Sequence, residues 1–118
     1  MIKQVILMRK DLKMRRGKEI AQGSHASMSF LIKYPIPNKA PIIKEWLEGG
    51  QTKICLQVHS EKELLDLAKT ANEAGLRVNV ITDAGRTEFD GVPTKTCLAI
   101  GPDLGADIDK ITKHLKLY

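Results

Sequence analysis

The sequence lacks any apolar run long enough to span a membrane, and its start, MIKQVILMRK, is too short and strand-like for a signal peptide. It has only two cysteines, Cys55 and Cys97, and each lies inside an apolar stretch. Neither belongs to a CxxC pair or has a histidine at ligand spacing. We therefore expect buried free thiols and a cytoplasmic protein.

Motifs for familiar chemistry are also missing. The three histidines are far apart and form no HExxH pattern, so we expect no metal. The chain has no GxSxG elbow, P-loop or GxGxxG stretch, and neither cysteine lies beside a plausible base. An enzyme built from this sequence would therefore activate water rather than form a covalent intermediate.

Positive charge is concentrated in the first third of the chain. Residues 1–33 hold eight cationic and two acidic side chains, whereas the remaining 85 residues hold 11 cationic and 12 acidic side chains. Four of these cations, Lys13, Arg15, Arg16 and Lys18, surround the start of a predicted helix, where carboxylates are normally found. Free backbone amides, the helix dipole and these side chains favour an anion such as a nucleic-acid phosphate. A basic face that serves solubility explains the charge equally well.

The hydrophobic pattern predicts one domain over residues 1–118. Short apolar runs predict strands at 2–8, 53–59, 77–82 and 96–100. Helical spacing predicts a helix from Gly17 that is stopped by Pro35 and Pro37, and further helices at 39–48 and 60–75. A turn at Gly101-Pro102 leads into a last helix at 103–114. The first helix would bury the face that contains Ile20, Ala21, Ser24, Met28, Leu31 and Ile32.

Strands that alternate with helices indicate an α/β fold. We expect a three-layer α/β/α sandwich around a small mixed, mostly parallel four-stranded sheet. The short connection at 83–95 indicates at least one antiparallel pair.

Two groups of polar residues are candidates for a site. Lys18, Gln22, His25 and Ser29 form one stripe along the first helix. The loop that contains Asp83, Arg86 and Thr87 directly follows the third strand, where ligands of open α/β sheets gather, and Thr96 begins the fourth strand. On the residues alone, a solvent-facing helix stripe and an ordinary Asp-Ala-Gly turn explain both groups at least as well.

The same residues carry a resemblance to the type 2 peptidyl-tRNA hydrolases of archaea and eukaryotes. The matching segments are Met8-Arg9, Asp11 to Met14, Gly17-Lys18, Ala21-Gln22, Ser24 to Ala26, Trp46-Leu47, Gly50-Gln51, Lys53, Asp83 to Thr87, Thr96, Ile100 to Pro102 and Lys113 to Tyr118. The resemblance spans essentially the whole chain. It implies hydrolysis of the ester between a peptide and the terminal ribose of tRNA without a cofactor, a mixed sheet covered on both faces, and a homodimer.

The family's proposed functional residues match Lys18, Asp83, Thr87 and Thr96 here, with Gln22, Ser24 and His25 nearby. On this resemblance we expect Asp83 to orient or deprotonate water, and Lys18, Thr87 and Thr96 to bind the ester oxygens. Lys13, Arg15, Arg16 and Arg86 would hold tRNA phosphates near the acceptor end, with Ser24 beside them. The sequence does not decide which residue is the base.

The chain departs from the family pattern in two places. Arg15-Arg16 stands where the family commonly has Gly-Lys, and residues 34–43 carry three prolines. The alternative function is a non-catalytic tRNA-binding or RNA-binding module of the same fold. The sequence has only five aromatic residues and none within the cationic run, which counts against a reader of single-stranded RNA.

Overall fold

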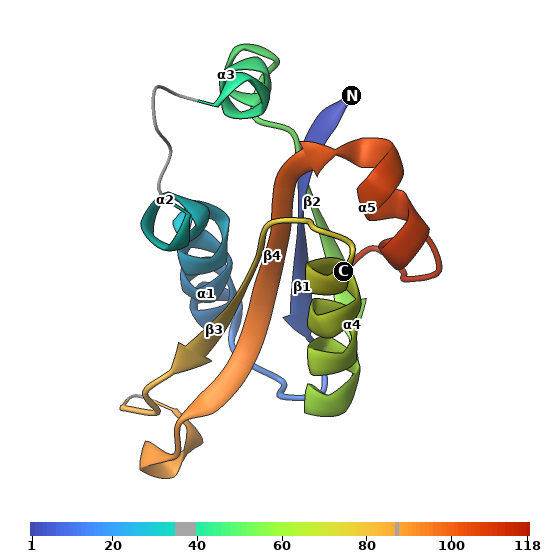
Figure 1. Ribbon diagram of the computed structural model, residues 1–118. Helices are drawn as coiled ribbons and strands as arrows, with labels where there is room; N and C mark the ends of the chain where they lie inside the picture. Colours follow the sequence, from blue (N-terminus) through green and yellow to red (C-terminus); the bar gives the residue numbers. More distant parts are fainter. Residues whose placement is uncertain (35–39, 87) are drawn as a thin grey trace.

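A four-stranded sheet forms the middle of the molecule in the computed structural model, which describes residues 1–34, 40–86 and 88–118. Its strands are β1 (Ile2–Arg9), β2 (Lys53–Val58), β3 (Val78–Asp83) and β4 (Thr94–Leu104), in the order β2-β1-β4-β3 (Figure 1). The four predicted strands are confirmed, and β4 is longer than predicted at both ends. Ile2 to Met8 are all buried because β1 lies inside the sheet and is covered on both faces.

The mixed character of the sheet is confirmed, but the prediction that it is mostly parallel is wrong. β1 pairs in parallel with β2, whereas β4 pairs antiparallel with both β1 and β3. The connection from β3 to β4 is too short for a crossover helix, so β4 must return antiparallel to β3. β4 then lies between β3 and β1, which leaves β3 at one edge of the sheet.

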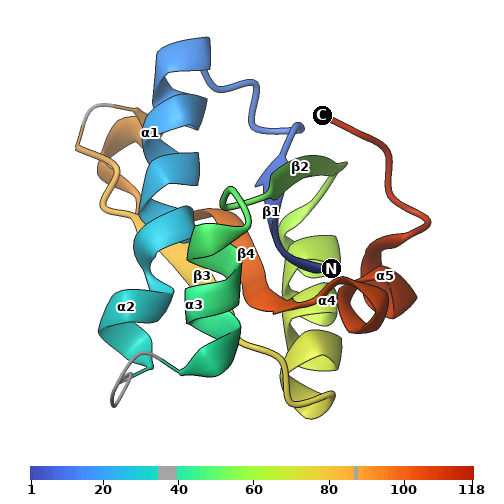
Figure 2. The same cartoon turned by 90° about the horizontal axis from the view of Figure 1, so that it is seen from above.

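Helices cover both faces of the sheet, as expected for three layers. On one face lie α1 (Arg16–Met28), α2 (Phe30–Lys33) and α3 (Pro41–Glu48), and on the other α4 (Glu61–Glu73) and α5 (Gly105–Thr112), as Figure 2 shows from above. Ser60 caps α4 through the Glu63 amide at 3.0 Å, which confirms the predicted capping signal. A short 3₁₀ turn, η1 (Phe89–Gly91), lies between β3 and β4. The predicted stops at Pro35 and Pro37 and the predicted start at Lys39 lie outside the described residues.

The predicted buried face of the first helix is wrong. The buried residues of α1 are Gln22 and Ala26, and Ser29, which follows α1, is buried as well. Ile20 and Met28 are 64% and 54% exposed. α1 therefore turns its polar stripe toward the sheet, because Gln22 finds hydrogen-bond partners there, and it leaves apolar side chains at the surface.

The predicted turn at Gly101-Pro102 is also wrong, because β4 runs straight through both residues to Leu104. Gly101 has a φ of +98°, and a Cβ atom there would lie 2.6 Å from the carbonyl oxygen of Lys3. A glycine at this position thus allows β4 and β1 to approach closely where their register shifts.

The last residues of the chain cover the edge of β2. Leu117 pairs with Leu56, and the Tyr118 amide donates to the carbonyl of Cys55 at 3.0 Å. The Tyr118 hydroxyl also bonds to Glu19 of α1, so the tail links β2 to the first turn of that helix. Within the described ranges, no helix has the length and apolar character needed to cross a membrane.

Candidate active site

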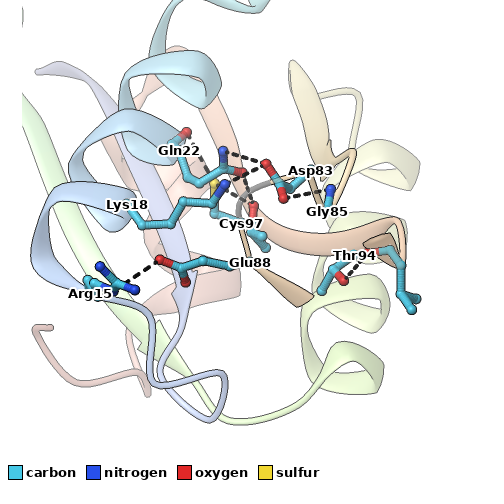
Figure 3. Close-up of polar contacts among 10 residues, drawn as sticks. Arg15, Lys18, Gln22, Asp83, Gly85, Glu88, Thr94 and Cys97 are labelled. Carbon is cyan, nitrogen blue, oxygen red and sulfur yellow. Dashed lines mark hydrogen bonds and ion pairs between the residues drawn. The ribbon is translucent and has the colours of Figure 1, made fainter. Parts of the chain in front are cut away.

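Lys18 and Asp83 form an ion pair between the first turn of α1 and the last residue of β3. The Lys18 ammonium lies 2.8 Å from Oδ1 of Asp83, and the two side chains are 14% and 13% exposed (Figure 3). The backbone amide of Gly85 donates to Oδ2 of Asp83 at 2.9 Å. Both carboxylate oxygens are thus held in place by donors from different elements.

A second layer of hydrogen bonds lies beneath this pair. The Gln22 side-chain amide donates to Oδ1 of Asp83 at 3.4 Å, and its carbonyl oxygen accepts from the Thr96 hydroxyl at 2.5 Å. Thr96 is fully buried at the start of β4. The hydroxyl therefore fixes which way the Gln22 amide points, and Gln22 transmits that orientation to Asp83.

These contacts set the charge of Asp83. The hydrogen bond from Lys18 is the main cause that lowers the pKa of this carboxyl, and the Gly85 amide and the charges of Lys18 and His25 act in the same direction. Partial burial opposes them without reversing the shift. Asp83 is therefore ionised at neutral pH, and it accepts hydrogen bonds rather than donating them.

A cavity of about 430 Å³ opens beside the pair, between β3 and the helices α1 and α2. Gln22, His25, Ser29 and Ile32 line one side of it, and residues 79–84 line the other. His25 is exposed and shares this cavity with Asp83. The structure thus brings together Lys18, Gln22, His25, Asp83 and Thr96 of the predicted site. Thr87 lies outside the described residues.

A larger cavity of about 660 Å³ lies on the other side of α1. Its lining includes Ile20, Ser24, Met28, Cys55 and Tyr118. Ser24 bonds to the carbonyl of Ile20 and faces this cavity, so the structure separates it from Asp83. The larger cavity is mostly apolar, whereas Asp83 and Gln22 line the smaller one. The smaller cavity is therefore the better candidate for chemistry.

The predicted phosphate ligands lie at the surface, three of them just before or at the start of α1 and Arg86 in the loop after β3. Lys13, Arg15, Arg16 and Arg86 are all exposed, and the Arg15 side chain is 88% exposed. The Arg15 guanidinium lies 3.7 Å from a carboxylate oxygen of Glu88. Their exposure leaves them accessible to a large anionic partner.

Sequence reasoning missed two neighbours of the site, Glu88 and Phe89. Glu88 lies beside Arg15, and the Lys18 ammonium lies 5.9 Å from the centre of the Phe89 ring. They directly follow the Asp83 to Thr87 segment, and Phe89 is one of only two phenylalanines in the chain. An aromatic residue so close to a predicted site is the signal that points to a role beside Lys18.

The cysteines do not offer a nucleophile. Burial raises the pKa of the Cys97 thiol to about 12, and burial with the nearby Glu19 charge raises that of Cys55 to about 11. Cys97 is buried as predicted, whereas Cys55 is only half-buried at the larger cavity. In the part of the chain that the structure describes, no group of three or more His, Cys, Asp or Glu side chains is arranged to hold a metal ion.

The fold and the site define an α/β protein whose ionised carboxylate is held by a lysine and a buried amide beside a cationic helix start. The family model described as Peptidyl-tRNA hydrolase PTH2 matches residues 2–118, and the chain belongs to this family. The resemblance seen in the sequence is thereby confirmed.

Individual relatives match over nearly their full length. A peptidyl-tRNA hydrolase from Methanocaldococcus jannaschii is 43% identical over 116 residues, which cover 98% of this chain and 99% of that protein. One from Nanoarchaeum equitans is 45% identical over 118 residues and covers 100% of both chains. One from Haloquadratum walsbyi is 44% identical over 117 residues, which cover 99% of this chain and 100% of that protein.

Proposed function

We propose that this protein hydrolyses the ester that joins a peptide, or an N-blocked amino acid, to the 3′-terminal ribose of tRNA. The observation that carries this proposal is the Lys18–Asp83 pair. Asp83 lines a cavity together with Gln22, which Thr96 orients, and Lys18 follows the exposed cations at the start of α1. Membership of the family and the printed names of its relatives support the same reaction. The reaction frees tRNA for reuse in translation, which agrees with a cytoplasmic location.

In the proposed mechanism Asp83 orients the attacking water. The carboxylate oxygens have further lone pairs besides those that accept from Lys18, Gln22 and Gly85, so one can accept a proton of the water in a hydrogen bond. The lowered pKa makes Asp83 a weak base, so its contribution is orientation more than proton removal. His25 shares the cavity, and an imidazole suits the transfer of the proton from the water to the departing ribose oxygen.

Lys18 supplies the positive charge at the reacting carbonyl. As the water oxygen bonds to the carbonyl carbon, negative charge develops on the carbonyl oxygen, and the Lys18 ammonium, 2.8 Å from Asp83 at the cavity, would stabilise it. The carbon–oxygen bond to the ribose then breaks and the ribose oxygen takes one proton of the water. The new carboxyl group of the peptide loses the other proton to solvent, and the peptide leaves as a carboxylate. Thr96 donates to Gln22 and is fully buried, so its role in this scheme is to position Gln22 rather than to bind the ester. Thr87 keeps its proposed role at the ester oxygens on the resemblance alone.

The proposed tRNA contacts are the exposed cations at the start of α1 and in the loop after β3. In this proposal Lys13, Arg15, Arg16 and Arg86 pair with acceptor-end phosphates, which their exposure supports, and Ser24 is a nearby contact on the family pattern. Arg15 already has a carboxylate neighbour in Glu88. Binding of a phosphate would exchange that exposed, weak ion pair for a stronger bidentate one.

A homodimer is proposed as the form of the protein in solution. It is supported by the apolar side chains that α1 and α2 leave at the surface, among them Ile20, Met28 and Leu31 at 54–64% exposure. Analytical ultracentrifugation of the wild type and of Ile20→Glu tests it, because a charge in an apolar interface should shift the protein toward monomer. A wild type that sediments as a monomer at micromolar concentration would exclude the dimer.

The enzymatic proposal is tested by the release of an N-acetylated amino acid from charged tRNA. We expect turnover by the wild type and losses of at least a hundredfold in kcat/KM for Asp83→Asn and Lys18→Ala, since each removes a group at the reacting atoms. The matched controls are Asp66→Asn and Lys62→Ala, which break an exposed ion pair of similar length on α4. A wild type that binds tRNA but releases no amino acid would overturn the proposal in favour of an RNA-binding module.

A further inference from the structure

The outer edge of β3 offers main-chain groups to the candidate active-site cavity. The Tyr34 hydroxyl accepts from the Val78 amide at 3.2 Å and donates to the Val78 carbonyl at 3.0 Å, so both groups of Val78 point away from β4. Main-chain groups alternate along a strand with a period of two residues. The amide and carbonyl of Val80 therefore face the same outer edge.

Val80 is also placed so that its main chain faces the cavity. Residues 79–84 line the cavity, but the Val80 side chain packs against the hydrophobic core on the opposite face of the sheet. What Val80 presents to the cavity is thus an amide and a carbonyl. Asp83, the last residue of β3, lines the cavity with Gln22, and Tyr34 occupies the edge of β3 at Val78, before Val80 along the strand.

We propose that this groove binds the last residues of the substrate's peptide as an additional strand beside β3, held by hydrogen bonds to the main chain of Val80. The inference rests on the proposed function, because it takes the ester to lie at Asp83. The side chains of peptides released from tRNA differ, whereas their main chain does not. Recognition through the main chain accepts all of them, as in other cases where a peptide adds a strand to a sheet edge.

The position of the ester fixes the direction of the peptide. The ester carbonyl is the C-terminal end of the peptide, so the peptide runs toward Asp83. β3 also runs toward Asp83, which is its last residue. The peptide and β3 are therefore parallel, and Val80 bonds to two different peptide residues, donating to one and accepting from the other.

The structure also limits the length of peptide that is held. Three residue steps separate Val80 from Asp83, or roughly 10 Å of strand. At Val78 the edge is already occupied, because Tyr34 bonds to both main-chain groups and the Lys33 ammonium lies 2.9 Å from the carbonyl. The groove therefore holds two or three peptide residues, and residues further from the ester make no main-chain bonds to β3.

The first test varies the substrate and leaves the protein unchanged. We expect kcat/KM of the wild type to rise from N-acetyl-aminoacyl-tRNA to tripeptidyl-tRNA with the same C-terminal residue, and then to level off. N-methylation of the peptide amide that donates to the Val80 carbonyl should lower kcat/KM about three- to tenfold, the effect of one hydrogen bond. Equal kcat/KM for all peptide lengths, with no effect of N-methylation at any of the last three residues, would overturn the proposal that the groove binds the peptide.

The second test removes the Val80 amide hydrogen. Proline is tolerated in an edge strand where its nitrogen faces outward, so Val80→Pro should preserve the pairing of β3 with β4. We expect the ratio of kcat/KM for tripeptidyl-tRNA to that for N-acetyl-aminoacyl-tRNA to fall about three- to tenfold. Val80→Ala also loses side-chain atoms but keeps the amide hydrogen, so the difference in this ratio between the two variants measures the amide hydrogen. A folded Val80→Pro with the wild-type ratio would contradict the proposal, and if this variant does not fold, the N-methylated substrates decide.

The outcomes separate the groove from the reaction. A wild type that hydrolyses no substrate of any length overturns both the proposed function and this inference. A wild type that hydrolyses all substrates without regard to length or N-methylation keeps the proposed function and overturns only the groove.

Discussion

The charge of Asp83 depends on one neighbouring side chain more than on any other. Because the hydrogen bond from Lys18 is the main cause of its lowered pKa, Lys18→Met should raise that pKa toward its ordinary value. The acid limb of the profile of kcat/KM against pH should then move to higher pH, in addition to the loss of rate. The profile of the residual activity, with an NMR titration of the Asp83 carboxyl carbon, measures both effects.

The same shift also affects stability, with a defined sign. A carboxyl whose pKa is lower in the folded state than in the unfolded state stabilises the fold above its unfolded pKa, and this contribution is lost as pH falls through the folded pKa. Lys18→Met should therefore lose some stability at neutral pH and little in strong acid. Lys62→Met removes an exposed lysine from α4 and is the matched control. An unchanged acid limb in Lys18→Met would show that another group sets it.

The variant Thr96→Val tests whether a buried hydroxyl affects the reaction by holding Gln22 in place. Thr96→Val keeps the shape of the side chain but leaves the Gln22 carbonyl oxygen without its buried donor, which should cost about 1–3 kcal/mol of unfolding free energy. With Gln22 no longer fixed, kcat should fall while KM changes little. Urea denaturation and steady-state kinetics measure the two effects.

Thr94→Val is the control for this change, because the Thr94 hydroxyl, at the start of β4, bonds locally to the carbonyl of Val92 just before the strand. Thr94→Val should change the unfolding free energy and kcat less than Thr96→Val does. A Thr96→Val enzyme that loses stability but keeps the wild-type kcat would make Thr96 purely structural.

At the scale of elements, the loop after β3 positions Asp83 through Gly85. Gly85 has a φ of +79°, and a Cβ atom there would lie 2.6 Å from the carbonyl oxygen of Val92. Gly85→Ala should therefore move the loop, weaken the bond to Asp83 and lower kcat at least tenfold. Gly91 has a similar φ of +77°, but among the described residues, chain neighbours apart, a Cβ atom there would have no heavy atom within 4 Å. Gly91→Ala therefore separates backbone strain from the clash. Equal losses of kcat in the two variants would mean that backbone strain alone, and not the clash with Val92, lowers kcat.

The elements show what the sequence can predict and where it fails. The strands and the capped helix α4 follow their patterns because apolar periodicity and Ser60 act locally. The buried face of α1 was predicted wrongly because Gln22 finds partners on β3 and β4 that no local pattern reveals. Gly101-Pro102 resembles a turn, but close contact with β1 keeps it within a strand. In both cases contacts between elements far apart in the sequence override the local pattern.

Most members of the candidate site were predictable, but Glu88 and Phe89 beside it were missed, and so were the hydrogen bonds that connect the members. Lys18, Gln22 and Asp83 are separated by up to 65 residues, and only the fold shows that they share hydrogen bonds. Ser24 lies on the same helix, yet it faces the other cavity. The spacing of residues in the sequence shows which side chains share one face of a helix. Only the packing of the helix decides which of its faces lies against the sheet.

At the scale of the whole molecule, the cationic surface should make tRNA binding depend on salt. Each phosphate contact contributes about 0.7–0.9 to the slope of log affinity against log salt concentration. The double variant Arg15→Ala/Arg16→Ala should therefore flatten that slope by roughly 1.5, measured by filter binding at several salt concentrations. Lys62→Ala/Lys69→Ala removes the same charge from exposed positions on α4, on the other face of the sheet. Because direct contacts and not net charge set the slope, the slope of this control should stay near that of the wild type. Equal flattening in both double variants would mean that tRNA responds to overall charge rather than to a defined surface.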